Sequence, residues 1–279
     1  MNAITEIARF LSYPFAVRAI VVGGAVSLCA ALLGVTLVLK RYSMIGDGLS
    51  HVGFAIFAVS AALGTTGAEL YIAIPLVIAA AIGLLRLTES SNVRGDAAIA
   101  ILSTLSLAVG YIIMYKAGTN VDVNSYMFGS MFTIKPLDAY VSVAVSAAVM
   151  ILFVVFFPKI FAVTFDEDFA RGIGVHAGAY NMLIASLTAV TVVVGMRMMG
   201  TLLITALIIF PSLTAMRVFR SFRGVAVCSA VVSLVCFFVG VAAAHLLAIP
   251  AGSTVVVVNA AAFAVASVIG TLRGKMGRI

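Results

Sequence analysis

Long apolar runs, separated by short stretches that carry most of the charged residues, make up almost the whole sequence. A helix that crosses a bilayer needs about 20 predominantly apolar residues, and nine runs reach or approach that length. They cover residues 16–39, 49–63, 70–87, 97–115, 137–157, 177–196, 201–217, 224–247 and 253–271. The pattern predicts an all-α polytopic membrane protein with about nine transmembrane helices, or eight if one short run does not span. No linker or block of charge divides the runs, so we expect a single domain over residues 1–279 without an extramembranous domain.

Two segments depart from this pattern. In residues 1–15, apolar side chains from Ile4 to Phe15 fall on one helical face. This predicts a short amphipathic segment at the membrane interface, and we find no cleavable signal peptide. Residues 116–136 are too polar to span and too apolar to be a plain loop. Irregular backbone at membrane depth must be buried in protein or line a cavity, so we expect a re-entrant or half-buried segment there.

Composition and charge agree with this class of protein. Hydrophobic residues make up 63% of the chain and charged residues 10%, and the mean hydropathy is +1.23, whereas a soluble domain carries about 25% charged residues. The net charge of +7 comes from basic residues in short loops, so we expect the lipid bilayer and no nucleic acid as a partner. Placing most Lys and Arg in the cytoplasm puts the carboxyl terminus inside and, with nine spans, the amino terminus outside. The three cysteines lie in apolar runs and form no metal-binding or disulfide pattern.

One octapeptide, Met44–His51, carries both a carboxylate and an imidazole beside a long apolar run. Asp47 and His51 are four residues apart and share one face of a helix, and Gly46 and Gly48 let another backbone or an ion come close. An ionisable residue at membrane depth is costly and indicates function. Oxygen and nitrogen ligands suit a divalent transition-metal ion. The alternative is that Asp47 caps the amino end of the second span and His51 makes an interhelical hydrogen bond.

A second cluster, residues 165–175, is the densest run of charge in the chain. An acidic first turn, an amphipathic stretch and a glycine stop predict a short helix on the cytoplasmic face. It is either a solvated segment, as most charge runs are, or a helix that docks a cytoplasmic partner. The candidate docking residues are Asp166, Phe169, Ala170 and Gly174.

The seventh span follows a methionine-rich stretch, Met196–Gly200, and is interrupted by Pro211. Proline inside a span kinks the helix and frees a carbonyl, whereas methionine rows are more often core packing than metal ligands. His176 and His245 are most simply structural. The candidates for the pathway or its gate are Asp122, Ser130, Met196, Met199 and Pro211.

Motifs of several enzyme classes are absent from the sequence. There is no GxxxxGK[ST] loop for a nucleotide and no HExxH zinc site, and no spacing suggests a Ser-His-Asp arrangement. The sequence therefore predicts a transport protein without enzymatic activity of its own.

The octapeptide and the residues before it, Leu39–His51, resemble the signature of the membrane permeases of bacterial zinc/manganese ABC importers. The pattern of that family is close to basic-basic-x-S-x-x-G-D-x-L-x-H. Further stretches resemble the same family in the same order along the chain. They are Arg94–Ile101, Val121–Val123 with Met127–Gly129, Asp166–Gly174, Met199–Leu203 with Pro211, and Pro250–Thr254. Where the family often has Asn or Asp after Phe-Gly, this chain has Ser130.

The resemblance implies a multi-pass permease in the cell membrane of a bacterium. It would work as a homodimer with a cytoplasmic ABC-type ATPase dimer and an extracellular or periplasmic metal-binding protein. Asp47 and His51 would contact the transported metal, the 166–174 helix would sit in a groove of the ATPase, and no cofactor would be bound permanently. The details look closest to zinc-importing members from Gram-positive bacteria, so the expected cargo is Zn²⁺, with Mn²⁺ or iron as the alternative. A gradient-driven metal carrier and a permease for a larger chelated cargo are further alternatives.

Overall fold

The structure is a computed structural model that describes residues 6, 9–65, 69–90, 95–118, 123–129 and 135–276. Within these ranges every regular element is a helix, and nine helices are long and apolar enough to cross a membrane. They are α2 (Pro14–Leu39), α3 (Ile45–Ala62), α4 (Glu69–Ser90), α5 (Gly95–Ala117), α7 (Pro136–Val155), α10 (Ala177–Met199), α11 (Thr201–Val218), α12 (Phe222–Leu247) and α13 (Ala251–Met276). The chain is an all-α, multi-pass membrane protein, as the apolar runs predict.

Local chemistry accounts for where several helices begin. Pro14 and Pro136 stand in the first turn of α2 and α7, where the N–H that proline lacks would have no helical partner anyway. The second span begins at Ile45 and not at residue 49. Polar and glycine residues ended the apolar run there, but a helix continues through such residues when neighbouring helices cover them. Asp47 is therefore a helical residue in the first turn of α3.

Three short helices connect the spans: α6 (Val123–Phe128), α8 (Phe157–Phe165) and α9 (Glu167–Gly172). α9 lies where the charge pattern predicts a short helix, and α6 lies inside the segment predicted to be half-buried. α8 is not apparent in the sequence, because apolar residues run on without a break from α7. The structure ends α7 at Val155 and starts α8 beside Pro158, a residue that begins helices readily.

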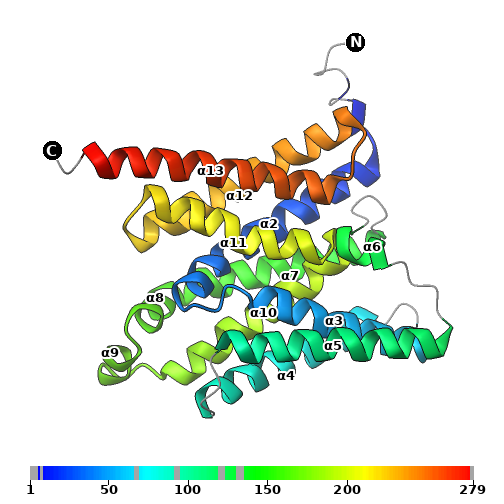
Figure 1. Cartoon of the computed structure of the whole chain (residues 1–279), viewed down its shortest axis with the longest axis horizontal. Coiled ribbons are helices and arrows are strands. Elements are labelled where there is room, and N and C mark those ends of the chain that lie inside the picture. Colours follow the sequence, from blue (N-terminus) through cyan, green and yellow to red (C-terminus); the bar gives the residue numbers. More distant parts are fainter. Residues whose placement is uncertain are drawn as a thin grey trace.

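The long helices lie side by side, with α6 at one end of the bundle and α8 and α9 at the other (Figure 1). The described part of the amino-terminal segment lies at the α6 end, where Phe10 stacks on His245 with ring centroids 4.2 Å apart, and the carboxyl terminus lies at the opposite end. Opposite ends for the two termini agree with an odd number of spans. Because basic residues favour the cytoplasm, we refer to the α8–α9 end as cytoplasmic and the α6 end as outer.

Small and hydroxylated residues bring α2, α11 and α12 into close contact in the core. A Cβ on Gly34 would lie 2.0 Å from the carbonyl oxygen of Ile208, so only glycine fits there. Ser229 and Ser233 of α12 donate hydrogen bonds to carbonyl oxygens of α2 at 3.1 and 3.0 Å. Close backbone approach and hydroxyl hydrogen bonds are the usual means of joining helices in a membrane. They join α2, α11 and α12 into one unit, and α3 packs on its other side against α4, α5, α10 and α11.

Candidate functional site

Asp47 and His51 lie on one face of α3, with Nε2 of His51 3.7 Å from Oδ2 of Asp47. One divalent ion about 2.0–2.2 Å from each atom fits between them. The side chains are 33% and 19% exposed, respectively, and within the described residues Nδ1 of His51 is buried without a hydrogen-bond partner. The N-cap position belongs to Met44, but Asp47 lies in the first turn of α3, where the helix dipole favours a carboxylate, so the structural role also agrees with its position.

The pair lies at the depth of the middle of the bundle. Gly46, the residue before Asp47, faces Ile208 of α11 and Val192 of α10, which a Cβ would approach to 2.7 and 3.9 Å. Val192 and Ile208 stand well inside their spans, Ala177–Met199 and Thr201–Val218. Although Asp47 follows closely after the basic Lys40, α3 therefore starts inside the protein and not at its cytoplasmic surface.

A tight turn makes this deep start feasible. The N–H of Tyr42 donates to the carbonyl of Leu37 at 2.8 Å and that of Arg41 to Val38 at 3.1 Å, the bonding pattern that closes a helix with a left-handed residue. That residue is Arg41, at φ 63°, where glycine is more usual. The chain thus reverses within a few residues after α2 and enters α3 directly.

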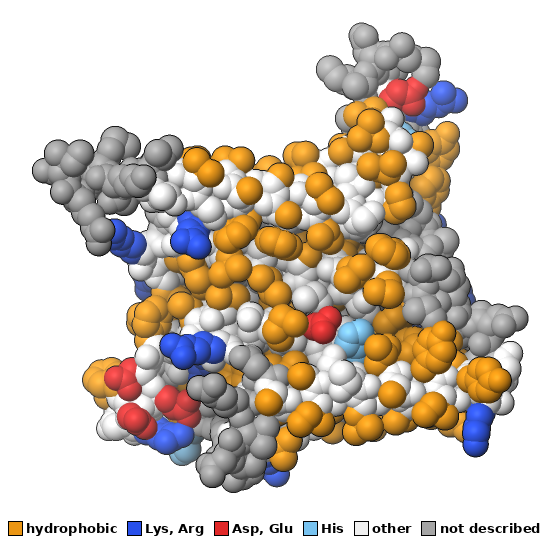
Figure 2. All heavy atoms as spheres, viewed as in Figure 1, with side chains coloured by type: hydrophobic (Ala, Val, Ile, Leu, Met, Phe, Trp, Pro, Cys, Tyr) orange, Lys and Arg blue, Asp and Glu red, His pale blue; other side chains and the backbone are white. Residues whose placement is uncertain are grey.

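A groove of about 380 Å³ runs past Asp47 between α3, α6, α11 and α13. Its wall is apolar except for the carboxylate and the hydroxyls of Thr205 and Ser253. Figure 2 shows a carboxylate beside an imidazole in the middle of a largely apolar face. The lining residues are Asp47, Phe128, Leu202, Thr205, Ala206, Ile209, Phe210, Ser253, Val256 and Val257. An ionisable pair on an apolar face at membrane depth has the character of a transport site.

Tyr126 of α6 ties the outer end of this site to α3. Its hydroxyl donates a hydrogen bond to the carbonyl of Ser50 and lies 3.8 Å from Sδ of Met196, and its ring lies 4.5 Å from that of Phe54. α6 is not among the membrane spans. Burial, followed by the charge of Asp47, raises the pKa of Tyr126 well above its ordinary value, so the hydroxyl keeps the proton that it donates. Sequence reasoning missed this residue because one tyrosine in an apolar stretch carries no motif.

Three glycines from separate sequence motifs meet where the groove reaches the outer end. A Cβ on Gly129 would lie 2.2 Å from the carbonyl carbon of Met199, one on Gly200 2.5 Å from the nitrogen of Gly129, and one on Gly252 2.6 Å from the carbonyl oxygen of Phe128. Gly129 and Gly200 also adopt φ 72° and 88°, which favours glycine. The backbones of α6, α11 and α13 therefore touch at this glycine crossing.

The other pathway candidates differ in position. The side chain of Met196 reaches α3, where its methyl carbon fills the space in front of Gly53, whereas that of Met199 points to Gly23 of α2. Both are buried. Pro211 is buried inside α11, next to the groove-lining Phe210 but not itself in the lining. Asp122 and Ser130 lie outside the described residues.

The predicted docking residues lie in and beside the short helix α9 at the cytoplasmic end. The carboxylate of Asp166 accepts a hydrogen bond from the N–H of Phe169 at 2.8 Å and caps α9. Ala170 is fully buried, whereas the apolar ring of Phe169 is 61% exposed. Gly174 adopts φ 83° with open space around it. α9 is thus anchored by one face and presents an aromatic ring on the other.

Within the described part of the chain, no group of three or more His, Cys, Asp or Glu side chains comes together as a metal centre. The site that one copy offers consists of the Asp47–His51 pair, and Met196 contacts α3 at Gly53, two residues beyond His51. Zinc sites in proteins take four ligands when structural and three plus water when catalytic. A single copy therefore supplies an incomplete coordination shell.

Similarity to known proteins extends over almost the whole chain. Residues 12–270 match the model of the ABC 3 transport family. A probable metal transport system membrane protein from Thermotoga maritima is 32% identical over 91% of this chain and 89% of its own length. The manganese import system permease protein ScaB from Streptococcus gordonii is 26% identical, over 91% and 90%. PsaBC from Streptococcus pneumoniae, solved in complex with Fab, has a chain of similar fold with a TM-score of 0.82 at 27% identity, covering 93% of this chain and 95% of that one.

Proposed function

Because this chain belongs to the ABC 3 transport family, we propose that it is the membrane permease of an ATP-driven importer for divalent transition-metal ions. The observation that carries the proposal is the Asp47–His51 pair, 3.7 Å apart at the middle of the bundle, with Asp47 lining a largely apolar groove. A carboxylate offsets the cost of removing a divalent ion from water. The imidazole selects ions that accept nitrogen over calcium and magnesium, which prefer oxygen.

We infer that a second copy of the chain covers this groove. A partly exposed carboxylate at membrane depth is costly when it faces lipid, and one copy offers too few ligands for an ion. A twofold pair of permeases with the grooves facing each other would offer two carboxylates and two imidazoles, the four ligands of a tetrahedral site. The homodimer therefore removes the exposed charge and completes the coordination shell in the same step.

The remaining partners follow from the family and from α9. The sequence contains no nucleotide loop, so ATP hydrolysis belongs to a separate ATPase at the cytoplasmic end, where the exposed ring of Phe169 is available for docking. The outer end, near the glycine crossing, would receive the ion from a metal-binding protein. Motion of α9 against the bundle would then open and close the groove by rigid-body gating.

Zinc and manganese are the two candidate cargos. The sequence resemblance favours zinc, and one imidazole with one carboxylate suits that borderline ion. The relative from Streptococcus gordonii is named for manganese import, and manganese accepts the same ligands with a stronger preference for oxygen. Uptake of labelled zinc and manganese in competition, by cells that depend on this importer, identifies the cargo.

The test of the function is metal uptake by variants of the pair. Asp47→Asn keeps the size of the side chain and removes its charge, and His51→Ala removes the nitrogen; each should reduce uptake to background while the complex still assembles. Ser253→Ala, which changes a hydroxyl in the wall of the same groove, should retain most of the uptake. Full uptake by either site variant would contradict the proposed site. Rapid metal transport by the purified chain alone, without ATPase, would instead favour a gradient-driven carrier.

A further inference from the structure

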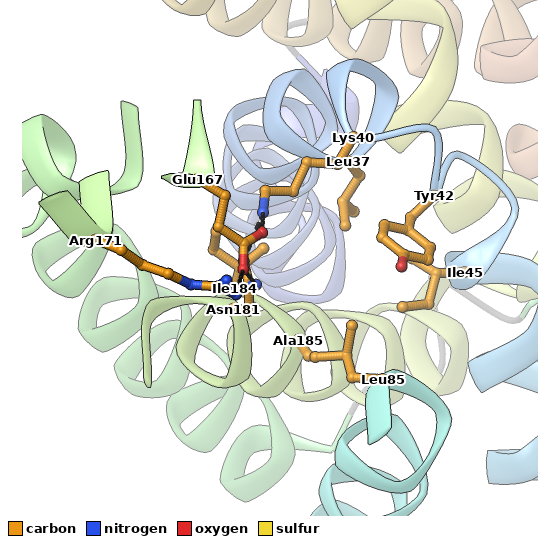
Figure 3. A pocket seen from close by; sticks show the side chains of 10 residues that line it. All are labelled: Leu37, Lys40, Tyr42, Ile45, Leu85, Glu167, Arg171, Asn181, Ile184 and Ala185. Carbon is orange, nitrogen blue, oxygen red and sulfur yellow. Dashed lines mark hydrogen bonds and ion pairs between the residues drawn. The ribbon is translucent and has the colours of Figure 1, made fainter. Parts of the chain in front are cut away.

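A cavity of about 330 Å³, lined equally by polar and apolar residues, lies at the cytoplasmic end, on the path from α9 to the start of α3 (Figure 3). Lys40, at the end of α2, and Glu167, in the first turn of α9, point toward each other across it, with Nζ 3.6 Å from Oε2. Asn181 of α10 joins both: its Oδ1 accepts from Lys40 at 2.5 Å, and its Nδ2 donates to Glu167 at 3.2 Å. The end of α2 thus shares one hydrogen-bonded network with two consecutive helices, α9 and α10, from a distant part of the sequence.

The network acts on the segment that determines where α3 begins. Lys40 is the last residue before the left-handed turn at Arg41, and Ile45, the first residue of α3, lines the same cavity. Tyr42 in between has its hydroxyl 3.4 Å from that of Thr88 in α4 and its ring against Gly95 of α5. A displacement of Lys40 therefore reaches Ile45 through a four-residue connection, in which the side chain of Tyr42 is held between α4 and α5. Asp47 stands two residues beyond, on the same rigid helix.

We propose that Lys40, Glu167 and Asn181 are positioning residues that transmit the movement of the docking helix α9 to the metal-binding helix α3. This inference rests on the proposed function, since it needs α9 to be the element that the ATPase moves. Glu167 uses both carboxylate oxygens, Oε2 toward Lys40 and Oε1 toward Asn181 and Arg171. When α9 shifts, this carboxylate pulls on the end of α2 and on α10 together.

The next residue of α9 offers a matched control. Glu167 is 32% exposed and faces the cavity, whereas Asp168 is 96% exposed and pairs with Arg171 at 3.7 Å. Both residues are acidic, lie in the first turn of the same helix and carry the same charge. Glu167→Gln and Asp168→Asn therefore change the net charge and the helix dipole interaction alike, and only the first disturbs the link to α3.

The experiment uses the permease assembled with its ATPase in lipid vesicles and measures both ATP hydrolysis and metal uptake. Glu167→Gln and Lys40→Met should each lower the metal transported per ATP by about tenfold, within the usual range of coupling between sites. Copurification of the ATPase and metal binding by the permease should stay unchanged. Asp168→Asn leaves the link to Lys40 intact, so it should keep the metal transported per ATP of the unmodified protein, and any effect of this exposed position on docking should appear in the copurification of the ATPase. Since the two residues act through one contact, the double variant should be no worse than the more impaired single variant.

The outcomes separate this inference from the function on which it rests. Normal coupling by Glu167→Gln in a complex whose unmodified form is ATP-driven would overturn the transmission role and leave the permease function intact. Equal losses in Glu167→Gln and Asp168→Asn would also overturn it, because they would report a general effect of charge on docking. If the unmodified complex showed no ATP-dependent uptake, the proposed function itself would fail.

Discussion

Neighbouring residues that supply no charged ligand hold Asp47 and His51 in place. Gly46 and Gly48 let α3 approach Ile208 of α11 and Ile99 of α5, where an added Cβ would lie 2.7 and 2.9 Å from a side-chain carbon. Rigid placement of a site depends on such supporting contacts more than on the ligands themselves. Single substitutions around the pair should therefore change transport without removing a ligand.

Tyr126 gives the most direct test at this scale. Tyr126→Phe removes the hydrogen bond that joins α6 to the Ser50 carbonyl, a net contribution of about 0.5–1.5 kcal/mol. The open population of the outer end should rise by roughly twofold to tenfold as a result. The measurement is the reaction of Thr205→Cys, in a background without the native cysteines, with a membrane-impermeant thiol reagent added from outside. Tyr111→Phe, on the exposed face of α5, is the control. Unchanged labelling in Tyr126→Phe would show that the hydrogen bond of Tyr126 does not help to keep the outer end closed.

At the scale of helices, contacts between glycine backbones fix how α6, α11 and α13 meet. This crossing combines stretches that the sequence singles out separately: Phe128–Gly129, Met199–Thr201 and Pro250–Thr254. Two of its glycines adopt left-handed backbone angles. A side chain at the crossing would have to force the three helices apart, because the atoms in contact belong to backbone and cannot move independently.

A matched pair of glycine substitutions measures that constraint. Gly118→Ala places a side chain at φ 64° with none of the described residues within 4 Å, and should lower stability by about 1–2 kcal/mol for the left-handed angle alone. Gly129→Ala, at φ 72°, adds a clash with Met199 and should cost about 1–3 kcal/mol more. Thermal unfolding of the two variants in detergent gives the difference, and equal midpoints would show that the crossing tolerates a methyl group.

The sequence predicts the nine spans because each apolar run is a local property that lipid demands of every spanning helix. It also predicts Asp47 and His51 as candidate site residues, since an acid and an imidazole stand out in an apolar chain, and the structure brings the two side chains together. It misses α8, because no polar residue separates that helix from α7. It also misses the partners of Tyr126 and the link from Lys40 to Glu167, because each joins residues far apart in the chain. The apolar run beginning at residue 49 places the start of α3 too late, since buried polar residues look like a loop.

At the scale of the whole molecule, two faces of the bundle differ in polarity and therefore in the surroundings that stabilise them. The groove that contains Asp47 includes a carboxylate and two hydroxyls among its lining residues. A second groove, of about 410 Å³ between α2, α7, α8 and α12, is apolar apart from Arg223 near its cytoplasmic end. Lipid chains can fill the second groove at little cost. The carboxylate in the first groove is costly when it faces lipid, so a protein surface that covers it is favoured.

Cysteine cross-linking distinguishes the two faces. Leu202 lines the Asp47 groove and Val231 lines the apolar groove, and both side chains are exposed in one copy. The two variants are Leu202→Cys and Val231→Cys. In a background without native cysteines, oxidation in membranes should join two copies through residue 202 and leave the residue 231 variant monomeric on a denaturing gel. The reverse pattern would place the dimer interface on the other side of the bundle and leave Asp47 facing lipid.

The deep start of α3 bears on how long an ion stays bound. A helix carries roughly half a positive charge at its amino end, and α3 begins at Ile45, within one turn of Asp47. In the proposed site, that partial charge would weaken the hold of the carboxylate on a cation. A conducting site must bind strongly enough to be occupied and weakly enough to empty, so we expect modest affinity and a short dwell time. Selection of scarce metal would then fall to the protein that delivers the ion, while the permease turns over quickly.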